Sequence, residues 1–77
     1  MNADLKACVV SRLTTVRNAD SQAKVDSEYN NCLGFLAGLG VAGVLSIWDE
    51  MKLCALLVNA YHFASRELVF RDIGAAA

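Results

Sequence analysis

A run of seventeen residues without a charge, Cys32 to Trp48 (CLGFLAGLGVAGVLSIW), most constrains what this chain can fold into. Its length reaches the lower limit for a helix that crosses a membrane, which needs about 20 apolar residues. Its composition argues against that use, because the run contains four glycines, which are poor helix formers. No basic residue flanks its start, and the nearest is Lys24.

A helix stop and a helix start divide this run. Gly43 suits the left-handed residue that follows a helix end, and Val44 is placed to contact Leu39 as in a Schellman motif. Ser46 and Asp49 then form the S-x-x-D pattern of an N-terminal capping box. Each piece is too short to cross a membrane, so we expect a helical hairpin. A membrane-associated hairpin is the alternative.

The rest of the chain also favours helices, because it contains no proline and no glycine before Gly34. Apolar spacing predicts three helices, at about 3–18, 22–42 and 47–70, followed by a frayed GAAA end. The start of the second helix is placed only between residues 20 and 27, since the polar connection offers several N-caps: Asn18, Asp20, Asp26 and Ser27. The expected fold is all-α, a single domain over residues 1–77, with an antiparallel hairpin of the second and third helices as its core.

The apolar faces predict which side chains are buried. The first helix is amphipathic, with one face made of Leu5, Cys8, Val9, Leu13 and Val16. Arg12 interrupts this face; we expect it to extend from the edge, and a carboxylate partner across an interface is the alternative. The second helix carries a stripe of Tyr29, Cys32, Leu33, Leu36, Leu39 and Gly40.

The third helix is apolar over more than half of its circumference. One side holds Ile47, Met51, Cys54, Leu57, Val58, Tyr61 and Leu68, and a second side holds Leu53, Leu56, Ala60 and Ala64. So wide an arc needs more than one neighbour. A chain of 77 residues buries only about 60% of its unfolded surface. With 56% hydrophobic residues to cover, we expect a homodimer.

Charge and cysteines limit the partners and the compartment. The net charge is −1 and the basic residues alternate with acidic ones, which argues against nucleic acid. Three widely spaced cysteines, Cys8, Cys32 and Cys54, predict reduced, buried thiols in a cytoplasmic protein. The charged N-terminus does not have the pattern of a signal peptide.

No pattern for catalysis, a metal or a cofactor emerges. His62 is the only histidine, and no acid or nucleophile stands at a spacing that builds a site around it. The glycines from Gly34 to Gly43 lack the order and the lysine of a phosphate-binding loop. We therefore expect a protein that is not an enzyme and holds no cofactor.

Contact surfaces are the remaining functional candidates. One face of the second helix carries small residues, Gly34, Gly38 and Ala42, beside Phe35. Small residues allow the backbone of a partner to approach closely. The alternative is that another helix of the same chain packs there. Trp48 and Arg66 are typical of interface hot spots, although Trp48 alternatively covers the hairpin turn. With the second side of the third helix, the predicted interface is Gly34, Phe35, Gly38, Ala42, Trp48, Leu53, Leu56, Ala60 and Arg66.

The stretch YNNCLGFLAGLGVAGVLSIWDEMKLCALLVNA resembles small helical proteins of bacterial phages, plasmids and other mobile elements, through Tyr29, Leu33-Gly34-Phe35 and the glycines that follow. The resemblance covers about half of the chain. It implies a helix hairpin in an accessory protein that docks on a host protein, and it carries over no functional residue. We expect a module that binds and inhibits or regulates a larger protein. The alternative of a DNA-binding helix-turn-helix is disfavoured by Asp49 and Glu50 at the start of the third helix, because they repel phosphate.

Overall fold

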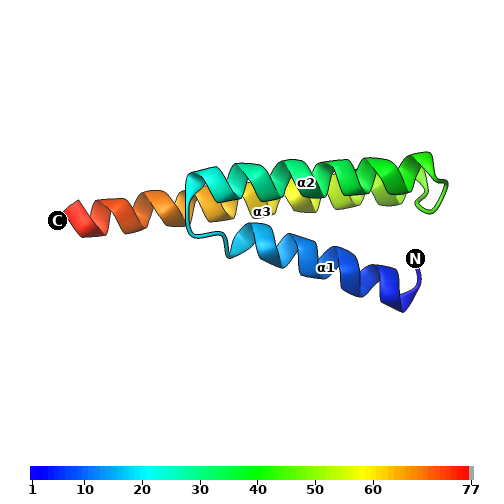
Figure 1. Ribbon diagram of the computed structural model, residues 1–77, viewed down its shortest axis with the longest axis horizontal. Helices are drawn as coiled ribbons and strands as arrows, with labels where there is room; N and C mark the ends of the chain where they lie inside the picture. Colours follow the sequence, from blue (N-terminus) through cyan, green and yellow to red (C-terminus); the bar gives the residue numbers. More distant parts are fainter. Residues whose placement is uncertain (77) are drawn as a thin grey trace.

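The computed structural model describes residues 1–76 and contains three helices: α1 (Ala3–Arg17), α2 (Gln22–Val41) and α3 (Ile47–Ala76). Within these residues there is no strand, so the prediction of an all-α fold is confirmed (Figure 1). The molecule measures 49 × 19 × 17 Å along its principal axes. Nowhere in the described part of the chain is a helix both long enough and apolar enough to span a membrane.

The three helices pack along one another, and α3 is the longest. Figure 1 shows α2 and α3 side by side in opposite directions, with α1 along the pair. The last turns of α3 continue past the start of α2 without a helix beside them. The predicted end of this helix at residue 70 is wrong, because α3 includes Gly74 and continues to Ala76. Glycine weakens a helix without breaking it, and alanine, which follows it, is the best helix former.

The N-terminal caps fix where α1 and α2 begin. The backbone N–H of Leu5 donates to Asn2 Oδ1 at 2.7 Å, and that of Lys24 donates to Ser21 Oγ at 3.2 Å. The predicted start of α2 at about residue 22 is confirmed, but the predicted capping residue is wrong, because Ser21 was not among the four N-caps. Asn18, one of the four, instead ends α1, where its N–H donates to Thr14 O at 3.0 Å.

The turn between α2 and α3 has the predicted geometry. Gly43 has φ +73°, the left-handed conformation that glycine adopts most easily. Val44 N donates to Leu39 O at 2.9 Å, and Gly43 N donates to Gly40 O at 3.1 Å, which together define the Schellman motif. Asp49 N then donates to Ser46 Oγ at 3.1 Å. The stop at Gly43 and the start at Ser46 are therefore confirmed.

All three helices contribute to one apolar core. Its buried residues are Val9 and Val16 of α1, Cys32 and Leu36 of α2, Leu45 of the turn, and Leu53, Leu57 and Ala60 of α3. Cys8 was predicted to be buried and is exposed. Its neighbour Val9 takes the inward direction, and successive residues of a helix point about 100° apart.

Candidate functional site

Two residues of the predicted interface lie inside the chain's own core. Leu53 and Ala60 are only 8% and 4% exposed, and both belong to the cluster shared by the three helices. They cannot contact a partner, so their assignment to an interface is wrong. The physical reason is that α1 and α2 together cover this side of α3, which had been assigned to a second copy.

Phe35 has a partner within the chain. The Arg12 guanidinium lies over its ring, with Cζ 4.1 Å from the centroid. This contact is a cation–π interaction, worth about 0.5–1 kcal/mol at an exposed site. It accounts for a charge in the apolar face of α1 without a carboxylate partner. Phe35 is half-buried as well, so only part of its side chain is available to a partner.

The small residues on the back of α2 remain open. A Cβ added at Gly34 or Gly38 would meet no atom within 4 Å, and Ala42 is exposed. These glycines therefore do not admit another helix of the same chain, and that alternative is wrong. Leu56 and Arg66, also predicted for the interface, are exposed on α3.

An apolar patch surrounds the turn between α2 and α3. It consists of Val41, Val44 and Trp48, and is called the turn patch below. Val41 is 91% exposed and Trp48 is 69% exposed. A tryptophan with this exposure does not close over the hairpin turn, so the second interpretation of Trp48 is wrong.

A second apolar surface runs along α3 and is called the α3 stripe below. It consists of five large side chains that are between 42% and 69% exposed: Ile47, Met51, Val58, Val69 and Ile73. At 100° per residue they fall within about 80° of one another, on the opposite side from Leu53. None of the five was predicted as an interface residue. Their helical spacing was visible, but Ile47, Met51 and Val58 were grouped with Leu57, which is buried.

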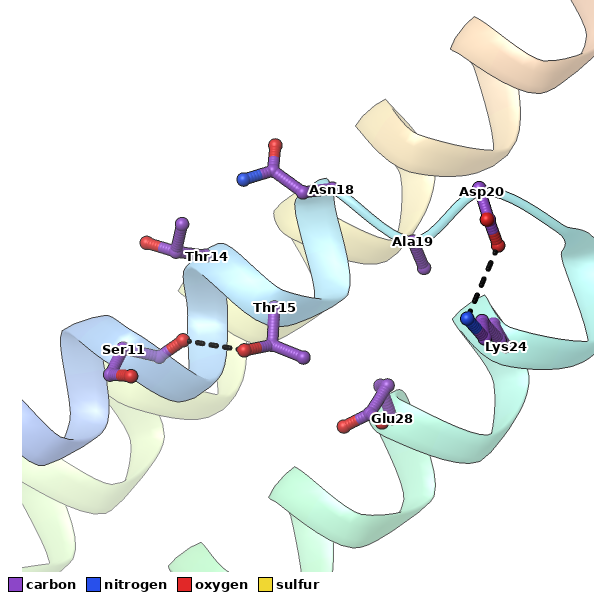
Figure 2. Close-up of a pocket in the computed structure, with 8 residues that line it drawn as sticks. All are labelled: Ser11, Thr14, Thr15, Asn18, Ala19, Asp20, Lys24 and Glu28. Carbon is purple, nitrogen blue, oxygen red and sulfur yellow. Dashed lines mark hydrogen bonds and ion pairs between the residues drawn. The ribbon is translucent and has the colours of Figure 1, made fainter.

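Two grooves lie beside α1. The larger, a cleft of about 510 Å³, is bordered by Ser11, Thr15, Asp20 and Lys24 (Figure 2). Three of its polar side chains are engaged locally, since Thr15 Oγ1 donates to Ser11 O at 3.0 Å and Lys24 Nζ lies 3.6 Å from Asp20 Oδ1. Both members of that ion pair are largely exposed, which makes it a weak surface contact.

The second groove, of about 330 Å³, lies between α1 and α3. Arg17 and Arg66 border it, with Leu56 and Phe63 as apolar walls. Arg17 is engaged with Phe63, because its Cζ lies 4.3 Å from the ring centroid. Neither groove contains a nucleophile paired with a base.

A polar cluster joins the start of α2 to α3. Tyr61 Oη donates to Asp26 Oδ1 at 2.8 Å, and this bond raises the pKa of the Tyr61 hydroxyl. Gln22 Nε2 donates to Ser65 Oγ at 3.2 Å. Each donor has a nearby acceptor, so the cluster positions the helices and offers no reactive group. Asp26 was predicted as a helix cap and instead makes this bond between helices.

The cysteines and the histidine do not form a site. Burial raises the pKa of the Cys32 thiol more than the nearby Arg12 charge lowers it. Such a thiol is a poor nucleophile, because the thiolate is the reactive form. His62 is exposed, and across the described residues no three side chains of His, Cys, Asp or Glu gather closely enough to hold a metal ion.

Comparison of the chain with protein-family models, with curated proteins and with solved structures finds no match. The turn patch and the α3 stripe remain as the candidate sites for contact with a partner.

Proposed function

We propose that this protein is a non-enzymatic interaction module that self-associates and binds a larger protein, which it inhibits or regulates. The observation that carries the proposal is the exposure of Trp48 and Val41 at one end of the molecule and of the α3 stripe along its side. Exposed apolar patches of this kind mark binding surfaces in soluble proteins. The hairpin of α2 and α3 is the proposed core of the module.

The turn patch is the proposed contact with the larger protein. Tryptophan is enriched among the few residues that carry most of the energy of an interface. A helix end that presents Trp48 with Val41 and Val44 fits an apolar pocket on a partner. Burial of this patch is the proposed mechanism, because it excludes other ligands from the partner's pocket.

The cytoplasm of a bacterium is the proposed setting. Cys8, Cys32 and Cys54 are free thiols, as expected in a reducing compartment. The resemblance to small helical proteins of bacterial mobile elements makes a bacterial host protein the partner to seek first.

DNA binding through a helix-turn-helix has less support. The two helices of that motif cross at about 90–120°. Here α2 and α3 run alongside each other, and the first turn of α3 carries Asp49 and Glu50.

The experiment has two stages. A bacterial protein retained by the immobilised wild-type chain is purified, and its affinity is measured by calorimetry against the wild type, Trp48→Asp and Lys52→Ala. Loss of a hot spot costs at least about 2 kcal/mol, so Trp48→Asp should weaken binding about 30-fold. Lys52→Ala, an exposed change one turn along α3, should leave the affinity unchanged. Equal binding by all three chains would refute the role of the turn patch.

A further inference from the structure

We infer that the α3 stripe is the seam of an antiparallel homodimer, in which α3 of one copy packs along α3 of the other. The two-fold axis is level with residue 60 and passes between Val58 and His62, on the exposed side of the helix. This inference rests on the self-association in the proposed function and specifies its surface and geometry. Its occupant is a second copy of this chain.

The C-terminal part of α3 lacks a neighbouring helix within the chain. The hydrogen bond from Gln22 to Ser65 places the start of α2 level with Ser65, and α3 continues beyond it (Figure 1). Only one side of this extension, at Glu67 and Arg71, borders the end of α1. Val69, Phe70 and Ile73 are each more than half exposed on it. No helix of the same chain covers these three side chains, so a neighbouring molecule that packs on them would remove apolar surface from water.

The stripe has the symmetry that a two-fold axis requires. Ile47 and Ile73 lie thirteen residues on either side of Ala60, and Met51 and Val69 lie nine residues on either side. The intervening positions continue the pattern and lie on the same side of the helix: Ala55 with Ser65, and Val58 with His62. In an isologous interface, residue i of one copy contacts residue j of the other, and j contacts i. Two copies of α3 in opposite directions therefore place large side chains against large ones and small against small.

The antiparallel direction also supplies the missing neighbour. It places the part of α3 beyond Ser65 in one copy beside the first turns of α3 in the other copy, where Ile47 and Met51 are exposed. A parallel pair would leave the two extensions to cover only each other. Opposed helix dipoles favour the same direction.

The exposed area of the stripe is a substantial part of what a dimer interface needs. From their exposed fractions, the five stripe residues present roughly 500 Å² of side-chain surface, against about 800 Å² per partner in a standard interface. His62, which lies between Val58 and Val69 on the same side and is exposed, adds to this area. The stripe therefore supplies more than half of a standard interface, and the surface of α3 that flanks it supplies the remainder.

The geometry is tested by disulfide trapping. In a background with Cys8→Ser and Cys54→Ala, single variants Met51→Cys and Val69→Cys are prepared, mixed, allowed to exchange and oxidised. Both positions are exposed, so the substitutions leave the core intact. The mixture should form a covalent dimer of twice the 8.3 kDa chain, whereas each variant alone should not. Trapping in each variant alone, with none added by mixing, would overturn the antiparallel geometry.

Light scattering provides the second readout. The wild type should elute as a dimer at about 50 µM, a concentration above the dissociation constants typical of standard interfaces. Val58→Glu places a charge in the seam and should give a helical monomer, while Lys52→Glu, away from the stripe, should remain a dimer. A wild type that is monomeric at this concentration, or a Val58→Glu variant that remains dimeric, would overturn the inference. A monomeric wild type would leave untouched the binding of a larger protein at the turn patch, which is tested separately by Trp48→Asp.

Discussion

Leu56 and Leu57 are adjacent in α3 and differ sharply in burial, which allows a matched test of how α3 faces the core. Leu57 is fully buried in the cluster shared by the three helices, whereas Leu56 is 51% exposed. Substitution by alanine removes the same atoms at both sites, and the change in helix propensity is the same. The difference between the two variants therefore measures the burial of the side chain.

Leu57→Ala should reduce the free energy of unfolding by about 3 kcal/mol, the lower part of the range for fully buried leucines. A chain of this length has a total stability of about 4–11 kcal/mol, so the loss is a large fraction of it. The melting temperature should fall by roughly 15 °C. Leu56→Ala loses at most half of the burial and no packed core contact, so it should cost less than about 1 kcal/mol.

The assay is urea denaturation followed by circular dichroism at one protein concentration, because self-association would make the stability depend on concentration. Equal losses in the two variants, or a larger loss for Leu56→Ala, would refute the placement of Leu57 in the core.

Two further predictions use matched pairs. In thermal melts, Gly43→Ala should destabilise the protein by about 1 kcal/mol or more, because Gly43 has a positive φ, whereas Gly34→Ala should stabilise it by about 0.5–1 kcal/mol, because that site is open and helical. A stabilising Gly43→Ala would contradict the turn geometry. With a thiol reagent at pH 8, Cys8 should react within minutes and Cys32 only after unfolding, because burial lowers its thiolate fraction by raising its pKa. Equal labelling rates in the folded protein would contradict the placement of Cys32.

Local signals in the sequence predicted a helix end where a residue has one preferred structural role at that position. Gly43 needs no Cβ in the left-handed conformation, and Ser46 is a preferred N-cap, so the turn between α2 and α3 was predictable. The start of α2 was less so, because five polar residues close together can all cap a helix. In the structure Asn18 ends α1 and Ser21 caps α2.

The direction in which α3 faces was not predictable from spacing alone. Both of its sides are apolar, and periodicity does not say which side α1 and α2 cover. In the structure Leu53 and Ala60, which were predicted for the interface, are buried. Ile47, Met51 and Val58, which were grouped with the buried Leu57, are exposed. The contact between Arg12 and Phe35 joins α1 to α2 and depends on how the two helices pack. No pattern within one helix therefore predicts it.

Hydrogen–deuterium exchange of residues 66–74, measured by mass spectrometry at about 1 µM and about 100 µM protein, tests most directly whether another copy covers the apolar surface of α3. These concentrations lie at and above a micromolar dissociation constant, the weak end of the range for interfaces of standard area. A neighbouring copy should slow the exchange of this segment at least tenfold at the higher concentration, because an uncovered helical extension opens freely. Rapid exchange at the same rate at both concentrations would contradict the account.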